Sequence, residues 1–191
     1  MVFRVLLVNG GSGVGKSTVV GELCENWEAF RQVMSITSRE KRGEDDDHVF
    51  MDRGVVRELV EGGNVVDWTE VGGELYCTTL DCFREDKINV YIVDDEGVEK
   101  EWGSEFDVLK VRLVGRSWVD DEERIGRVVN WLGDENFDFV VQVREDVGEV
   151  AWDLVEFCVD NGWLKVSDEF IDEMNRIASE VSQNFDDNCE I

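Results

Sequence analysis

The sequence predicts an α/β fold in three layers, with a parallel central sheet, a small mostly antiparallel insertion and a short helical segment. Three observations predict this class. Apolar stretches of strand length alternate along most of the chain with stretches of helical periodicity, which is typical of a parallel sheet covered on both faces. One region, residues 48–79, breaks that alternation with short half-polar strands. A glycine-rich segment, GGSGVGKS at 10–17, stands between the first apolar stretch and the first helical one.

The expected elements follow this alternation in order. Mostly apolar runs such as VFRVLLVN and INVYIV have the composition of strands buried on both faces, and runs such as STVVGELCENW have helical spacing. We expect strands of the parallel sheet at 2–9, 33–37, 88–95, 108–115 and 137–143, and helices at 15–27, 120–132, 147–163 and 167–182.

The region that breaks the alternation predicts a small insertion. Two half-polar strands, at 48–52 and within 65–79, flank an expected helix at 53–63, and we expect Trp68 in the core of this insertion. The whole chain, 1–191, is therefore predicted to be one domain. Its core covers about 1–34, 80–111 and 133–185, its insertion about 35–79, and the short helical segment about 112–132.

Composition limits the partners and the compartment. The 191 residues include 45 acidic and 19 basic side chains, and the formal net charge of −26 argues against nucleic acid or an anionic membrane as a partner. No apolar run is long enough to predict a membrane-spanning helix. The five cysteines form no Cys-x-x-Cys pair, which favours reduced thiols in a cytoplasmic protein over zinc or disulfides. We expect a monomer or a homodimer.

The glycine-rich segment matches G-x-x-x-x-G-K-[ST] between an expected strand and an expected helix, which is the context this phosphate-binding loop requires. Backbone N–H groups in such a loop form an anion nest, and the helix N-terminus adds positive potential. Lys16 is expected to reach the β- and γ-phosphates of ATP, and the Ser17 hydroxyl to bind Mg²⁺. The expected ATP-binding residues are Gly11, Ser12, Gly13, Val14, Gly15, Lys16, Ser17 and Thr18.

A second positive cluster follows at SITSREKRGEDDDHVF, residues 35–50. A kinase for a phosphorylated acceptor needs a second anion site in line with the γ-phosphate. Arg39 and Arg42 could supply it, because the guanidinium group is always charged and binds phosphate through two bonds. The alternative interpretation of this stretch alone is two solvated surface arginines.

Taken together, the motifs resemble those of the guanylate kinase family. GGSGVGKST is similar to the loop of that family, Gly-Pro-Ser-Gly-x-Gly-Lys, with Gly11 in place of proline. SITSREKRGE, DWTEVGGELYCTT, IVDDEGV and FDFVV resemble four further family segments, in the family order. The resemblance covers about residues 5–160, and the two segments between the loop and IVDDEGV are the specific part.

The resemblance implies a set of acceptor-site roles. It places a carboxylate, Asp67, where the family has a glutamate that accepts bonds from guanine N1–H and the 2-amino group. It also implies base contacts from Thr78 and Asp94, with Asp94 helping to hold hydrated Mg²⁺. His48 stands in place of a tyrosine that touches the phosphate. The residues expected to hold the monophosphate are Ser35, Arg39, Arg42, His48 and Tyr76.

The resemblance also implies that the short helical segment at about 112–132 is a lid, and that two of its arginines close on the phosphates. Arg116 and Arg127 have the family spacing, Arg124 is a competing candidate, and Arg112 is expected to lie in the preceding strand instead. The implied catalytic residues are Lys16, Arg39, Arg42, Arg116 and Arg127.

The function implied is transfer of the γ-phosphoryl group from ATP, with Mg²⁺, to GMP or dGMP. Two alternatives remain open at this point. One is a ribose bisphosphate phosphokinase or another (deoxy)nucleotide kinase, which would not need the carboxylate at Asp67. The other is a guanylate-kinase-like binding module without catalysis, and the intact Lys16 and Ser17 argue against it.

Overall fold

The computed structural model describes residues 2–41, 48–115 and 132–165. Its centre is a five-stranded sheet with the order β2-β7-β1-β8-β9, and every pair of neighbours is parallel. The α/β class with a parallel central sheet is thereby confirmed. The strands of this sheet are β1 (Phe3–Gly10), β2 (Phe30–Gln32), β7 (Ile88–Ile92), β8 (Phe106–Val114) and β9 (Phe139–Gln142).

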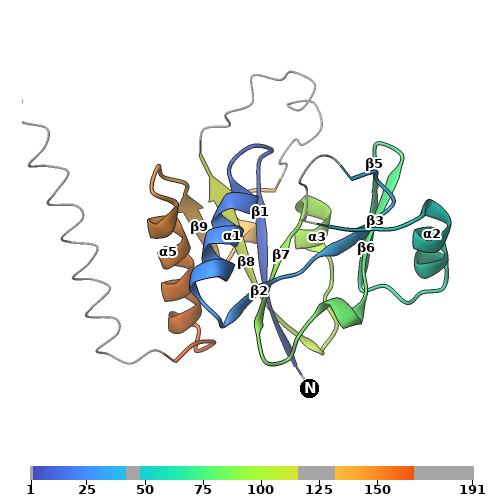
Figure 1. The fold of residues 1–191 in the computed structure, drawn as a ribbon. Coiled ribbons are helices and arrows are strands. Elements are labelled where there is room, and N and C mark those ends of the chain that lie inside the picture. Colours follow the sequence, from blue (N-terminus) through green and yellow to red (C-terminus); the bar gives the residue numbers. More distant parts are fainter. Residues whose placement is uncertain (1, 42–47, 116–131, 166–191) are drawn as a thin grey trace, which may run out of the picture.

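Helices cover both faces of this sheet. On one face α1 (Lys16–Asn26) and α5 (Val147–Asp160) pack side by side, and on the other lies the short α3 (Asp95–Glu99) (Figure 1). Two single-turn 3₁₀ helices, η1 (Leu80–Cys82) and η2 (Asp134–Asn136), lie in the connections.

The central strand β1 shows why its sequence is apolar at most positions. Leu6 and Val8 join the apolar cluster beneath α1 and α5, whereas Val5 and Leu7 join the cluster on the opposite face. Successive side chains of a strand point to opposite faces, so a strand buried on both sides needs apolar residues at nearly every position.

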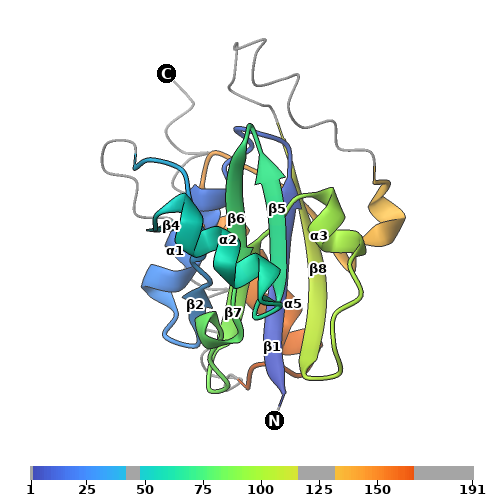
Figure 2. The same ribbon diagram turned by 90° about the vertical axis from the view of Figure 1, so that its right-hand side faces the viewer.

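The insertion forms a second, mixed sheet of four strands in the order β4-β3-β6-β5. The pairs β3–β6 and β5–β6 are antiparallel, and β3–β4 is parallel. Figure 2 shows this sheet and its helix in front of the parallel sheet. Its elements are β3 (Ser35–Thr37), β4 (His48–Phe50), α2 (Arg53–Glu61), β5 (Asp67–Val71) and β6 (Glu74–Thr78).

Two expectations about the insertion need correction. Residues 33–37 are not one strand of the parallel sheet, because that sheet holds β2 at 30–32 and the chain then crosses over to β3 in the small sheet. Trp68 is not in a core: its exposed fraction is 53%. It lies on β5, an edge strand, whereas α2 packs against β6 and β3.

The expected lid lies almost wholly outside the described residues. Strand β8 continues to Val114, so Arg112 lies in a strand as predicted, and the expected lid began at 112, three residues inside that strand. The helix expected at 120–132 falls, except for Leu132, on residues that the structure does not describe, and so does all of the helix expected at 167–182. Within the described ranges, none of the helices is both long and apolar enough to span a bilayer.

Candidate functional site

The glycine-rich loop connects β1 directly to α1, as the motif requires. At Gly10 the chain passes so close to β8 that a Cβ atom would lie 2.5 Å from the Leu113 carbonyl oxygen. Gly15 precedes the helix with a φ of 101°, in the left-handed region that favours glycine. These two glycines let the chain turn sharply and begin the helix at Lys16.

The N-terminus of α1 differs from those of the other α-helices in the described part of the chain. Asp52, Asp94 and Asp146 cap α2, α3 and α5 by accepting bonds from backbone N–H groups, whereas no side chain caps α1. The first N–H groups of a helix need acceptors, and the helix dipole favours an anion there. The uncapped end of α1 therefore suits a phosphate group.

Lys16 lies folded over the loop. Its Nζ donates to the carbonyl oxygens of Gly10 at 2.7 Å and Gly11 at 3.0 Å. Burial lowers the pKa of this ammonium group. Phosphate oxygens near Nζ would oppose this shift, because an adjacent negative charge favours the charged form of a lysine.

The small sheet has two chemically different faces. Strand registers pair Ile36 and Trp68 with Cys77, so these residues share one face, and there Ile36, Leu75 and Cys77 form an apolar cluster with Val56 of α2. The registers place polar residues on the opposite face, because neighbouring residues of a strand alternate. That face carries Ser35, Thr37, His48, Asp67, Thr69, Tyr76 and Thr78.

The polar face forms one wall of a cleft of about 380 Å³, and the end of β7 together with α3 forms the other. Ser35, His48, Asp67, Tyr76 and Asp94, five residues expected to bind the acceptor, all line this cleft. The His48 Nδ1 atom lies 2.8 Å from the Ser35 hydroxyl, and the His48 ring is 5.5 Å from that of Tyr76.

The remaining expected residues lie in different places. The Arg39 guanidinium group is 5.5 Å from the centre of the Phe50 ring, and Arg39 is not among the residues lining the cleft. Thr78 is fully buried, and its hydroxyl donates to the Tyr91 hydroxyl at 2.8 Å. Arg42, Arg116, Arg124 and Arg127 fall outside the described residues.

Two residues of the cleft were not singled out from the sequence. Tyr91 donates to Asp67 Oδ2 at 3.2 Å, and Lys100 forms an ion pair with Asp67 Oδ1 at 2.9 Å. Tyr91 carries a hydroxyl group inside a mostly apolar strand sequence, which could have marked it. Nothing in the sequence marked Lys100, because only the fold brings α3 to the small sheet.

A third unpredicted residue, Asp95, is buried beside the glycine-rich loop. Its carboxylate accepts from the amide of Asn9, on β1, at 3.0 Å and from the backbone N–H of Leu132 at 3.2 Å. Arg112 donates to the carbonyl oxygen of Leu132 at 2.6 Å. Asp95 and Arg112 thereby anchor the chain where it re-enters the described structure after 116–131.

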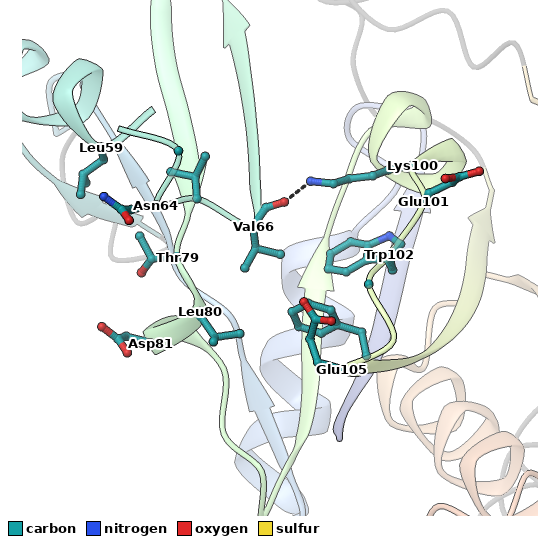
Figure 3. A pocket seen from close by; sticks show the side chains of 14 residues that line it. Leu59, Asn64, Val66, Thr79, Leu80, Asp81, Lys100, Glu101, Trp102 and Glu105 are labelled. Atoms are coloured by element: carbon teal, nitrogen blue, oxygen red, sulfur yellow. Dashed lines mark hydrogen bonds between the residues drawn. The ribbon is translucent and has the colours of Figure 1, made fainter. Parts of the chain in front are cut away.

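A second and larger cavity, of about 630 Å³, shares Lys100 with the cleft (Figure 3). Trp102, Leu80 and Phe106 contribute apolar surface, and the acidic side chains on it are Asp81, Glu101 and Glu105. None of the residues expected to bind ATP or the acceptor lines this cavity.

Comparison with known proteins gives a consistent result. No model of a known protein family matches the chain. The chain is 26% identical over 167 residues to a guanylate kinase of Helicobacter hepaticus, which covers 75% of this chain and 83% of that protein. It is 23% identical over 129 residues to a guanylate kinase of Trichodesmium erythraeum, covering 64% of this chain and 69% of that protein. The crystal structure of guanylate kinase from Anaplasma phagocytophilum has the same fold, with a TM-score of 0.61 and 22% identity over 86% of this chain and 88% of that one.

Proposed function

The chain belongs to the guanylate kinase family as a distant member, and from this premise we propose that it is a nucleoside monophosphate kinase. In the proposed reaction the γ-phosphoryl group of ATP passes to GMP or dGMP, giving ADP and GDP or dGDP. The glycine-rich loop binds the triphosphate of ATP, and the cleft beneath the small sheet binds the monophosphate.

One observation carries the proposal. Five of the side chains that the resemblance implies as acceptor ligands line a single cleft, although four of them come from separate strands of the small sheet and Asp94 follows β7. Strand β7 lies next to β1 in the parallel sheet, and the glycine-rich loop follows the end of β1. Ligands of α/β proteins commonly bind at the carboxyl ends of adjacent parallel strands, so this arrangement suits two substrates that react with each other.

The chemistry proposed for these residues is mainly alignment and charge neutralisation. The acceptor phosphate is already an anion, so no side chain needs to remove a proton from it. Lys16 balances charge on the β- and γ-phosphates, and Ser35, Tyr76 and His48 orient the acceptor phosphate. We assign the arginines expected around the two phosphates to the same task on the resemblance alone.

The oxygen donors near the loop fit Mg²⁺. Ser17 follows Lys16 in the first turn of α1, and Asp94 follows β7, the strand beside β1. Mg²⁺ prefers oxygen ligands, keeps several waters and is usually held by one or two carboxylates plus substrate phosphates. Such a site needs no large ligand cluster, and the described residues contain no group of three or more His, Cys, Asp or Glu side chains suited to a metal. When bound with ATP, Mg²⁺ would neutralise charge on the phosphates.

A panel of acceptors tests the proposal. Purified full-length protein is mixed with ATP, Mg²⁺ and each ribo- or deoxynucleoside monophosphate, and ADP release is measured. We expect GMP or dGMP to stimulate release most strongly. If no monophosphate raises ADP release above background, the chain is not a nucleoside monophosphate kinase, and a binding module or a sugar-phosphate kinase takes its place. If only AMP, CMP or TMP is phosphorylated, the kinase class stands but the guanine assignment is wrong.

A further inference from the structure

Lys100 reaches from the end of α3 across to the small sheet. Its Nζ donates to the carbonyl oxygen of Val66 and to Asp67 Oδ1, and the latter distance is 2.9 Å (Figure 3 shows the bond to Val66). The exposed fractions of the two side chains, 30% for Lys100 and 19% for Asp67, show that the pair is half-buried. The ammonium group also lies 5.6 Å from the centre of the Trp102 ring. Lys100 is therefore held in place from several sides.

The carboxylate of Asp67 is held from its other oxygen as well. Tyr91 donates to Oδ2, and its own hydroxyl accepts from Thr78. Burial, together with the charge of Asp67, raises the pKa of the Tyr91 hydroxyl well above its usual range. Tyr91 therefore stays protonated and acts as a donor. Each oxygen of Asp67 uses one acceptor position for these bonds, and a carboxylate oxygen has two.

The pair still has bonding capacity on the cleft side. An ammonium group carries three protons, and the bonds to Val66 and Asp67 use two of them. Both Lys100 and Asp67 line the cleft proposed to bind the acceptor. A ligand in the cleft therefore meets a donor and an acceptor side by side, less than 3 Å apart.

Guanine carries the matching groups on one edge: the O6 acceptor, then the N1–H donor, then the 2-amino donor. Adenine presents a 6-amino donor where guanine has O6, and its N1 is an acceptor. A donor beside a carboxylate acceptor is therefore complementary to the edge of guanine and mismatched with the edge of adenine.

Building on the proposed function, we propose that Lys100 is a specificity-determining residue that donates to O6 of the acceptor base, while Asp67 accepts from N1–H and the 2-amino group. The two residues together select a 6-oxopurine. Asp67 is one methylene shorter than the glutamate of the resembling family, and the bond from Lys100 adds a second contact with the base.

Three acceptors separate this role from a merely structural one. GMP has all three groups, IMP lacks only the 2-amino group, and 2-aminopurine riboside monophosphate lacks O6 and N1–H. If Lys100 contacts O6, then Lys100→Met should lower kcat/KM for GMP and IMP by the same factor. We expect about 10- to 100-fold, the usual value of a hydrogen bond to a charged group. The preference for GMP over the 2-aminopurine nucleotide should fall by a similar factor.

The proposal is overturned if Lys100→Met lowers the ratio of kcat/KM for GMP to kcat/KM for IMP, because Lys100 would then act by positioning Asp67 against the 2-amino group. It is equally overturned if kcat/KM falls equally for all three acceptors, or if no ratio changes. Lys100→Arg, which keeps a charged donor, should restore most of the preference. Lys87→Met is the matched control, since Lys87 pairs with Glu28 outside the cleft, and it should change none of the ratios.

Two further points keep the outcome decisive. If Lys100→Met does not fold by circular dichroism, Lys100→Gln, whose amide can still donate, replaces it with a smaller expected loss of preference. Failure of the proposed function is recognised separately, because the unaltered protein would then phosphorylate none of the three acceptors. Failure of this inference leaves turnover of GMP by the unaltered protein intact.

Discussion

The glycine-rich loop and the cleft proposed to bind the acceptor are built in opposite ways. The loop is one continuous segment between β1 and α1, and it offers mainly backbone N–H groups and a helix end. The cleft is made of side chains from four short strands, the end of β7 and α3. A backbone site depends on glycine geometry and treats all acceptors alike. A side-chain site can change its preference through one substitution, and two of the departures from the resembling family, His48 and Asp67, lie in the cleft.

The largest effect is expected at the loop. Lys16→Ala removes the ammonium group expected to reach the β- and γ-phosphates, and loss of one such electrostatic contact typically lowers kcat by about 10²- to 10³-fold. The loss should be the same factor for every acceptor, measured as ADP release. Lys87→Ala, which removes a lysine far along the chain from the loop, should retain full activity. Undiminished turnover in Lys16→Ala would mean that the loop is not the donor site.

The second effect should depend on the acceptor. Asp67→Asn places an amide donor against the donor edge of guanine, and a bidentate contact of this kind is worth about 1–3 kcal/mol, or roughly 5- to 150-fold. We expect kcat/KM for GMP to fall within this range while the KM for ATP stays unchanged. Glu70→Gln is the control, because Glu70 lies on the same strand but on the opposite face. A rise in the KM for ATP would show that the two sites are not separate.

The smallest effect concerns the support of the cleft. Tyr91→Phe leaves the Thr78 hydroxyl and Asp67 Oδ2 each without one partner, and an unsatisfied buried group costs about 1–3 kcal/mol. The free energy of unfolding, measured in urea, should fall by this amount. Trp68→Phe on the exposed edge of the small sheet should change it by less than about 0.5 kcal/mol. Equal losses in the two variants would mean that the hydroxyl contacts of Tyr91 do not stabilise the fold.

Much of the fold could be predicted from local sequence. The strands and helices of the core could be predicted from the periodicity of their apolar residues. The strand β1 is buried on both faces, and the helices α1 and α5 are each buried on one face. The insertion is harder, since its strands are short and only one face is apolar. That is why Trp68, an aromatic residue between polar neighbours, was expected in the core. Which edge of a small sheet stays uncovered depends on where α2 packs, and the sequence of β5 does not contain that information.

The candidate site also has a part that the sequence predicts and a part that it does not. The loop follows from one motif, and the residues expected in the cleft came from a resemblance that the fold bears out. Lys100 could not be inferred, because what distinguishes it is a contact with Asp67, which is 33 positions away in the chain. Tyr91, which is 24 positions from Asp67, was marked only by its hydroxyl group within a mostly apolar strand. Spacing within a motif does not encode such pairings.

The insertion leaves the parallel sheet after β2 and returns at β7, and these two strands are neighbours. It also has an apolar cluster of its own. A segment with these two properties is suited to transfer between relatives, and under the proposed assignment the acceptor preference would be transferred with it. Lys100 sets the condition for this transfer, because it lies outside the segment while its partner Asp67 lies inside. A chimaera that receives residues 35–79 alone contains the carboxylate without its lysine, so the residue at position 100 has to be transferred together with them.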